Sequence, residues 1–319
     1  AEDIEGNLLA GRAGTTSARR RRHLLPMTFR AFLAATRPEL ARPPAVHPAR
    51  LQHPDMAATL EALRFDVDAY DLAWQDCLTC GGFPRAVAEH HRTGAVTISY
   101  LRDLAAWLHR DVDPDAPAES VPLLLHGLAA RACNPLNVTT AAADLGYANH
   151  KLLGRRLERL IASFAGLWCP PRQDAGGVVA GGQAKFYLTD PLLAWLPCAL
   201  RAGLATPDMT TLNEMVLGVA LARTIDQLDE GRLFAGDAIG FIRTSAGREV
   251  DLAPVPVPGA AGTEPTTPLE SKWVDTGWRS EAKVIEGKYN AGVIATKSVL
   301  ELTHPTWAVP APLVALLLG

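Results

Sequence analysis

Gly247-Arg248-Glu249-Val250-Asp251-Leu252 and, after an insert rich in proline and glycine, Leu269-Glu270-Ser271-Lys272-Trp273 are the two stretches that decide the C-terminal fold. Turn-forming residues bound both stretches, so we expect two strands. Side chains alternate between the two faces of a strand, which places Glu249 with Asp251 and Glu270 with Lys272. We therefore expect acidic groups and a lysine to converge.

This convergence has two interpretations. Asp251, Glu270 and Lys272 form the set that a metal-dependent phosphodiesterase uses: two carboxylates to hold Mg²⁺, and an ammonium to steady the attacking water or the phosphate charge. Charged residues alternating with apolar ones are also typical of a strand with one solvent-exposed face, where the charges form structural ion pairs. The spacing alone leaves both interpretations open.

The composition is typical of a soluble protein with a substantial core. The chain has 319 residues, of which 48% are hydrophobic and 20% charged, enough for two or three domains. Its net charge of −3 gives no overall attraction to nucleic acid or to an anionic membrane, so DNA contact requires a local basic face. No apolar run reaches the ~18 residues of a membrane span, and the acidic N-terminus does not resemble a signal peptide. We expect a cytoplasmic protein with no membrane partner.

Helices are expected to dominate the first two thirds of the chain. Periodic apolar residues and proline at first-turn positions predict helices at Asp55–Leu63, Arg85–His91 and Thr97–Arg110, within a helical region of residues 48–116. The one cysteine pair with metal-like spacing, Cys77 and Cys80, has no second pair to complete a zinc site. We expect these two cysteines to pack beside the Gly81-Gly82 turn.

Residues 117–206 are predicted to form a winged-helix domain. Three short helices, at Leu123–Cys133, Val138–Leu145 and Asn149–Phe164, with a tight glycine-containing turn before the third, are typical of a helix-turn-helix. The following segment, from Leu167 to Leu188, has a glycine-rich tip between two apolar runs and is expected to form the hairpin of the wing.

The third of these helices carries a cluster of positive charge. Four cations recur along it: Lys151, Arg155, Arg156 and Arg159. A cationic face on the helix that enters a DNA groove would contact phosphates. A solvated face, packing against an acidic neighbouring domain, and a winged helix that serves only to join proteins remain open alternatives.

Residues 207–319 are predicted to form a small α/β unit. A helix, three strands, a helix and a fourth strand are expected, in that order, around a small central sheet. Their ranges are Thr210–Asp226, Ile239–Arg243, Glu249–Val255, Leu269–Val274, Arg279–Tyr289 and Gly292–Thr296. Glu214, near the start of the first helix, is either a third carboxylate of the site or an ordinary acid of an N-terminal turn.

Five segments together resemble prokaryotic AAA+ type ATP-binding proteins, in the order in which that family carries them. They are Leu25–Phe32, Gly81–Val87, Lys185–Pro191, Glu249–Asp251 and Glu270–Lys272. In that family a P-loop ATPase precedes a helical winged-helix region and a C-terminal domain of uncharacterised function with a restriction-endonuclease-like fold. The resemblance covers nearly the whole chain. It implies a mixed α and α/β fold, with a winged-helix region followed by a small endonuclease-like domain with a mixed sheet.

The phosphate loop of that family is missing from this sequence. No Gly-x-x-x-x-Gly-Lys-Ser/Thr occurs, so no glycine-rich cradle for nucleotide is expected. The resemblance places Leu8–Arg12 near the end of the ATPase module, which makes residues 1–47 a remnant of that module and a linker. The first residue is Ala, and we expect a fragment that begins partway through a longer reading frame. ATP is expected to bind only in the intact parent protein.

The resemblance also implies roles for the site residues. Asp251, Glu270 and Lys272 match the endonuclease-like signature as catalytic residues, and Glu214 matches its helix acid, so that Glu214, Asp251 and Glu270 would hold Mg²⁺. Ser271 stands where an aliphatic side chain usually faces the core, and its inward hydroxyl needs a partner.

Two functions follow from these expectations. The first is the C-terminal portion of an AAA+ type ATP-binding protein, associated with DNA through Lys151, Arg155, Arg156 and Arg159, with a Mg²⁺-dependent nuclease-like domain. The second is a non-catalytic regulatory or adaptor module that docks a protein partner, or a second copy of the chain, through its winged helix.

Overall fold

The computed structural model describes residues 25–174, 176–228, 238–244, 247–260 and 262–319. The expectations for Leu8–Arg12 and for the first part of the 1–47 segment lie outside the described residues.

Helices make up most of the described chain, and the sheets are small. The helices are α2 (Phe29–Thr36), α3 (Pro54–Ala62), α4 (Val67–Cys80), α5 (Pro84–Thr93), α6 (Ile98–Val112), α7 (Ser120–Ala129), α8 (Val138–Asp144), α9 (His150–Ala162), α10 (Pro191–Leu200), α11 (Met209–Leu228), α12 (Trp278–Tyr289) and α13 (Ala311–Leu318). The strands are β1 (Gly166–Cys169), β2 (Lys185–Leu188), β3 (Ile242–Arg243), β4 (Glu249–Val250), β5 (Pro256–Gly259), β6 (Gly262–Pro265), β7 (Leu269–Ser271), β8 (Gly292–Thr296) and β9 (Thr306–Pro310).

The helices that the sequence predicts are present, and side-chain caps fix where several of them begin. Thr97, Asn137, Asn149 and Asp190 each accept a hydrogen bond from a backbone N–H in the first turn of α6, α8, α9 and α10. Such a cap satisfies one of the donors that the first turn leaves without a partner. The predicted mixed α and α/β composition is therefore confirmed.

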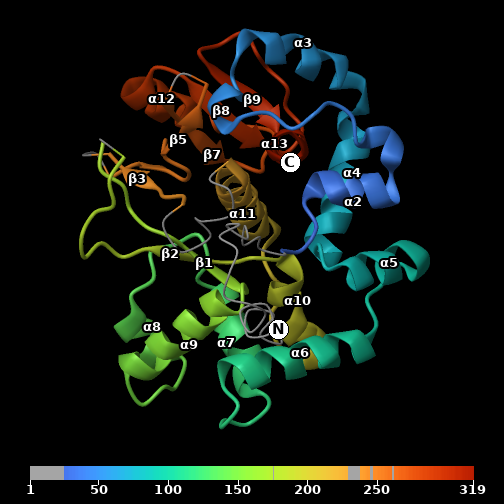
Figure 1. The fold of residues 1–319 in the computed structure, drawn as a ribbon, viewed down its shortest axis with the longest axis vertical. Helices are drawn as coiled ribbons and strands as arrows, with labels where there is room; N and C mark the ends of the chain where they lie inside the picture. Colours follow the sequence, from blue (N-terminus) through green and yellow to red (C-terminus); the bar gives the residue numbers. More distant parts are fainter. Residues whose placement is uncertain (1–24, 175, 229–237, 245–246, 261) are drawn as a thin grey trace, which may run out of the picture.

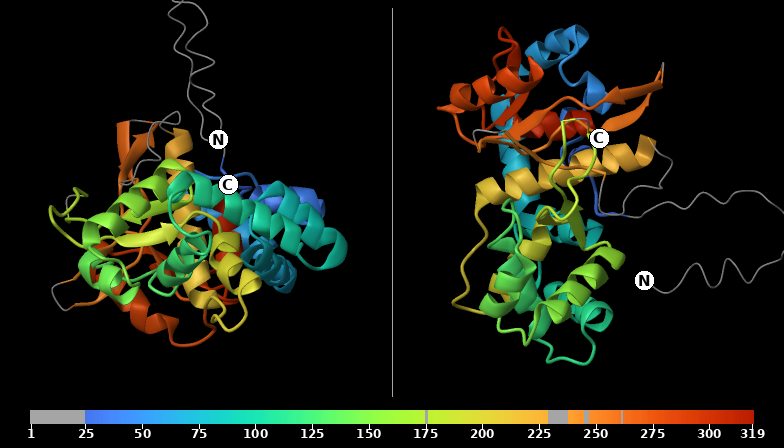
Figure 2. Two further views of the ribbon diagram at one scale, coloured as in Figure 1. Left: turned by 90° about the horizontal axis from the view of Figure 1, so that it is seen from below. Right: turned by 90° about the vertical axis from the view of Figure 1, so that its left-hand side faces the viewer.

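Helix α11 is the central element of the fold. It contacts β2, β5, β7, α4 and α13, and Figures 1 and 2 show it between the helices α6–α9 and the C-terminal strands. One continuous hydrophobic core runs from Phe29 to Leu318 across this arrangement. Helices α6–α9 and the C-terminal strands therefore belong to one core, with α11 between them.

The largest sheet among the described residues joins β7, β8 and β9 in parallel. An antiparallel bridge between Leu252 and Leu269 extends one edge. Ile294 and Ala308 point to one face, where they pack under α12, and Val293 and Val309 point to the other, which belongs to the main core. Strands covered on both faces read as continuous apolar runs, as Gly292–Thr296 does.

Three predicted strands are shorter than expected, and the one at Leu269–Val274 is the three-residue β7. The strand expected at Ile239–Arg243 is the two-residue β3, and the one at Glu249–Val255 is the two-residue β4. Pro254 and Pro256 cannot donate to a strand ladder, which limits the second of these. The insert that follows is not a plain loop, because β5 and β6 form an antiparallel hairpin within it.

The C-terminal elements β9 and α13 were not anticipated from the sequence. Pro310 ends β9, and Pro312 lies in the first turn of α13, where a missing N–H costs nothing. Residues 311–318 are all buried. The last three carbonyls of α13 accept hydrogen bonds from other elements. The Arg30 guanidinium donates to Leu316, the Val46 N–H to Leu317 and the Thr224 hydroxyl to Leu318.

No helix in the described part of the chain combines the length and apolar character needed to cross a bilayer.

Three segments of the family resemblance meet at one buried point. The Asp190 carboxylate accepts hydrogen bonds from the N–H of Gly82 at 2.7 Å and of Leu192 at 2.8 Å. The Met27 N–H donates to the Gly82 carbonyl at 2.6 Å. Burial raises the pKa of Asp190 to about 6, although its two N–H partners and Arg223 favour the charged form. These segments act together as a structural clasp made of Met27, Gly81, Gly82 and Asp190.

A carboxylate cluster centred on Lys185

Lys185 is the centre of the strongest cluster of charges in the described chain. Its side chain is fully buried, and its Nζ lies 2.7 Å from Glu214 Oε1, 2.7 Å from Glu249 Oε1 and 2.9 Å from Asp251 Oδ1. The Tyr187 hydroxyl donates to Glu214 Oε1 at 2.7 Å. We call Lys185, Glu214, Glu249, Asp251 and Glu270 the Lys185 cluster.

The elements that position this cluster come from both parts of the chain. Lys185 opens β2, where it pairs with Cys169 of β1 and forms a bridge to Pro135. Helix α11 supplies Glu214, and β4 with the residue after it supplies Glu249 and Asp251. Because Glu249 and Asp251 lie two residues apart on an extended segment, both can reach the same Nζ, as the alternation of side chains predicts.

Backbone hydrogen bonds join the two acidic stretches directly. Glu270 Oε2 accepts from the Asp251 N–H at 3.0 Å, and Asp251 Oδ2 accepts from the Ser271 N–H at 3.0 Å. Each carboxylate thus binds the backbone of the other strand. This crossed pair fixes the end of β4 against β7 and explains why Asp251 and Glu270 lie together.

The predicted need of Ser271 for a partner is confirmed. The Ser271 hydroxyl accepts a hydrogen bond from Asn213 Nδ2 at 2.9 Å, and Asn213 Oδ1 accepts from Trp74 Nε1 at 2.9 Å. Asn213 and Trp74 are fully buried. A polar chain therefore runs from α4 through α11 to β7, next to the cluster, with each of these side chains satisfied.

Burial and mutual repulsion set the protonation of the cluster. Burial, followed by the charge of Asp251, raises the pKa of Glu214 to about 7 and that of Glu270 to about 9. Burial would lower the pKa of Lys185, but Asp251, Glu214 and Glu249 outweigh it and hold that pKa well above its usual value. At neutral pH, Lys185 is charged and Glu270 is protonated.

Among the residues predicted as catalytic or metal-binding, the structure brings Glu214, Asp251 and Glu270 together but leaves Lys272 at the edge. Lys272 is 39% exposed and lies 3.4 Å from Glu281 Oε1, its partner in an ion pair. Strand β7 ends at Ser271, although the Lys272 N–H still donates to the Ala295 carbonyl of β8 at 2.8 Å. Its charge still lowers the pKa of the Glu270 carboxyl, against the larger effects of burial and Asp251.

The predicted metal ligands do not fit Mg²⁺ in this arrangement. Lys185 Nζ lies between Glu214 and Asp251, where a bridging divalent ion would be held, and the second Asp251 oxygen accepts from Ser271. In the described ranges, no three His, Cys, Asp or Glu side chains are arranged to hold a metal. A lysine ammonium therefore supplies the positive charge that the resemblance assigned to a metal.

The four cations predicted to contact DNA fall into two pairs. Arg156 forms an ion pair with Asp113 and lies over the Tyr147 ring, and Arg159 donates to the Val112 carbonyl at 3.0 Å. Lys151 and Arg155 are exposed. Within the described residues neither of them forms an ion pair, so half of the predicted face is available to a ligand.

Comparison with family models, with curated proteins and with solved structures gives no match to this chain. The cluster is therefore interpreted from its own geometry.

Lys185 itself was not identified as a site residue from the sequence. All four residues of β2 are buried, and the three that follow Lys185 in β2 are Phe, Tyr and Leu. A strand buried on both faces shows no alternation, so nothing indicates where its first side chain points. The useful signal is a lone lysine at the start of an apolar strand in a chain that has three acidic residues in predicted strands.

The raised pKa of Glu270 predicts a specific dependence of stability on pH. Its folded pKa of about 9 exceeds its ordinary value of 4.5, so its contribution is complete below pH 4.5 and is lost as pH rises through 9. One such group changes the free energy of unfolding by up to about 1.4 kcal/mol per pH unit. Urea denaturation between pH 5 and pH 9 should therefore show stability falling as pH rises.

Glu270→Gln is the test of that assignment. The amide stays neutral, and its oxygen can still accept from the Asp251 N–H, so stability should fall less steeply with pH than in the wild type. Equal slopes in the two proteins would mean that Glu270 titrates normally in the folded state.

Proposed function

We propose that this chain is a non-catalytic regulatory or adaptor module. Its winged-helix unit and its endonuclease-like α/β unit are held together by the Lys185 cluster. The observation that carries this proposal is the Lys185 ammonium, which lies within 2.9 Å of three carboxylates from the other unit. A cluster whose centre is already occupied by an internal ammonium serves as a joint and leaves no place for a catalytic ion.

The order of elements supports the winged-helix part of the proposal. Helices α7, α8 and α9 precede the β1–β2 hairpin, and Pro135, between α7 and α8, bridges to Lys185 of β2. This is the helix, short strand, two helices and hairpin expected of a winged helix. The α/β unit, with α11, β7, α12 and β8 in order around a parallel core, supports the endonuclease-like part.

Buried ion networks of this type specify an arrangement more than they stabilise it. The desolvation of a lysine and several carboxylates offsets most of their mutual attraction. The cluster fixes the position of β2 relative to α11 and β4, because only one placement of these elements brings Lys185 to its three carboxylates. This suits a module that must present its winged-helix unit in a fixed orientation to a protein partner.

Thermal melting with and without Mg²⁺ tests this function. Because Lys185 already supplies the positive charge, 10 mM Mg²⁺ should shift the melting temperature of the wild type by less than about 1 °C. Glu270→Gln should be equally insensitive. A clear rise with Mg²⁺ in the wild type that Glu270→Gln abolishes would replace the adaptor with a metal-dependent nuclease-like enzyme.

DNA association is the second candidate, and the exposure of Lys151 and Arg155 on α9 favours it. Contacts from these residues to phosphates would be independent of sequence. They would also weaken as salt increases, because binding releases counterions.

Charge reversal tests the DNA contact. Lys151→Glu with Arg155→Glu should weaken binding to duplex DNA of any sequence by about tenfold or more and reduce the salt dependence by about two counterions. Arg92→Glu with Arg102→Glu makes the same change in net charge at exposed positions on α5 and α6 and should have little effect. If both pairs weaken binding equally, α9 is not the contact, and the adaptor function stands alone.

A further inference from the structure

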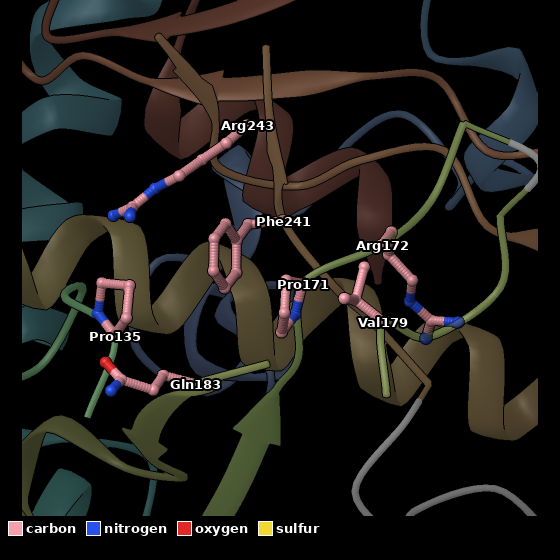
Figure 3. A pocket seen from close by; sticks show the side chains of 7 residues that line it. All are labelled: Pro135, Pro171, Arg172, Val179, Gln183, Phe241 and Arg243. Atoms are coloured by element: carbon pink, nitrogen blue, oxygen red, sulfur yellow. The ribbon is translucent and has the colours of Figure 1, made fainter. Parts of the chain in front are cut away.

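A pocket lies beside the Lys185 cluster, between the segment that follows β1 and strand β3. Its volume is about 350 Å³, within the range of small-molecule sites. Figure 3 shows the guanidinium of Arg243 and the carboxamide of Gln183 on the same side of the Phe241 ring, with Pro171 and Val179 on the other. Arg172 lies on the side of Pro171 and Val179, where it already donates to the carbonyls of Gly176 and Ile239. We call the side with Arg243 and Gln183 the polar end of the pocket.

The polar end is built around a guanidinium that is only partly used. Arg243 Nε donates to Glu249 Oε2 at 2.9 Å, and the side chain is 56% exposed. Within the described residues, the two terminal nitrogens of Arg243 have no hydrogen-bond partner. A guanidinium fixed through Nε presents those nitrogens as a preorganised fork for a planar anion. A ligand can bind there without breaking the pair with Glu249.

The middle of the pocket, around Phe241, is suited to a flat ring. The buried Phe241 ring forms its base, with the Arg243 guanidinium carbon 5.8 Å from the ring centroid. Pro135, Pro171 and Val179 complete the wall. Proline rings and an aromatic ring offer flat, rigid surfaces against which an aromatic ligand can pack at little entropic cost.

The surrounding charges limit the ligand to one negative charge. Lys185 and Arg243 lie beside Glu249 and Asp251, and Glu214 also pairs with Lys185. A dianion such as a phosphate monoester would meet repulsion from these carboxylates, and Arg172, the second guanidinium that lines the pocket, already donates to the carbonyls of Gly176 and Ile239. A carboxylate matches that guanidinium in both charge and shape.

We propose that this pocket binds a small aromatic carboxylate, with the carboxylate on Arg243 and Gln183 and the ring on Phe241, Pro135 and Pro171. The site goes beyond the adaptor function and does not depend on it. Its binding residues are distinct from those that the Mg²⁺ melts and the DNA titrations examine.

Calorimetric titration of the full chain with 2-naphthoate tests the site. We expect saturable binding that is about tenfold tighter than that of 2-naphthamide, which has the same shape without the charge. 2-Naphthyl phosphate should bind no more tightly than the carboxylate. No saturable binding of 2-naphthoate, or equal binding of the acid and the amide, would overturn the proposal.

Two arginines of the same hairpin provide a matched pair of variants. Arg243→Ala should weaken 2-naphthoate binding about tenfold or more. Arg248→Ala should change binding less than twofold, although Arg248 is similarly exposed, at 52%, and also pairs with a carboxylate, Glu281, at 2.7 Å. Equal losses in the two variants would show a general charge effect and would count against the pocket.

A third variant keeps the test decisive if Arg243→Ala proves unstable. Val179→Trp enlarges a partly exposed wall residue and should fill the pocket while retaining Arg243 and its pair with Glu249. The melting temperature shows whether the variant is folded. Folded Val179→Trp that still binds 2-naphthoate with wild-type affinity would overturn the assignment of the ring to this pocket.

Discussion

Replacing Lys185 by methionine is expected to lower the free energy of unfolding by about 3–5 kcal/mol at pH 7. Methionine fills a similar volume but removes the positive charge that Glu214, Glu249 and Asp251 share. Glu214 and Asp251 would then be buried together without a counterion, while Glu249 would keep Arg243, and the desolvation cost that the lysine offsets would appear. Urea denaturation at pH 7 measures the loss.

Two comparisons identify the cause of that loss. Lys272→Met removes a lysine from the same region, but Lys272 is 39% exposed and its partner is Glu281, so the cost should stay below about 1 kcal/mol. The deficit of Lys185→Met should also shrink at pH 5, because burial raises the pKa of Glu214 to about 7 and its protonation removes one of the unpaired negative charges. Equal costs for the two lysines would mean that the Lys185 cluster is not a buried ion network.

Gly81→Ala is expected to destabilise the chain by about 3–5 kcal/mol. Gly81 has φ 73° and ψ −167°, a conformation that is essentially restricted to glycine. A Cβ there would lie 2.0 Å from Asp190 Oδ1 and 2.9 Å from Leu192 Cβ. The carboxylate would have to move away from the Gly82 N–H, which would break the clasp. Chemical denaturation gives the change in free energy.

Gly94→Ala measures the cost of a left-handed backbone without a steric clash, at ψ 3° where Gly81 has ψ −167°. Gly94 also has a positive φ, 77°, but a Cβ there would meet nothing within 4 Å. Its cost should be about 1–2 kcal/mol, which is the strain of the left-handed backbone alone. The clash also predicts that Gly81→Ala and Asp190→Ala are not additive, because removing Asp190 removes the obstacle. Additive effects would mean that the cost of Gly81→Ala does not come from the clash with Asp190.

The sequence predicted those charged residues of the site that lie on strands with one polar face. The alternation of Glu249, Val250 and Asp251 placed both acids on one side, and in the structure both contact Lys185. It failed for Lys272, which pairs with Glu281, because nothing in the sequence shows that β7 ends at Ser271 and not at the predicted Val274. It failed for Lys185 because β2 is buried on both faces and carries no periodic signal.

For the fold too, the sequence predicts the elements that have a periodic polar pattern and misses those that are buried all round. Helices α6 and α9 have polar caps and amphipathic faces, and the sequence predicted them to within a few residues. Residues 306–318 are almost entirely buried, so their apolar run has no period that distinguishes β9 from α13. Only the tertiary contacts of α13 with α2, α4 and α11 reveal why that run is a helix.

The contacts that close the last turn of α13 have a consequence for how the chain acquires its structure during synthesis. Arg30 and Val46 satisfy carbonyls of residues 316 and 317 that the ribosome adds some 270 residues later. Until then the apolar faces of α2 and α4 that receive α13 remain open to water. The nascent chain therefore carries an unfinished hydrophobic surface until residues 311–318 have been added, and chaperones that hold such surfaces should associate with it until α13 emerges.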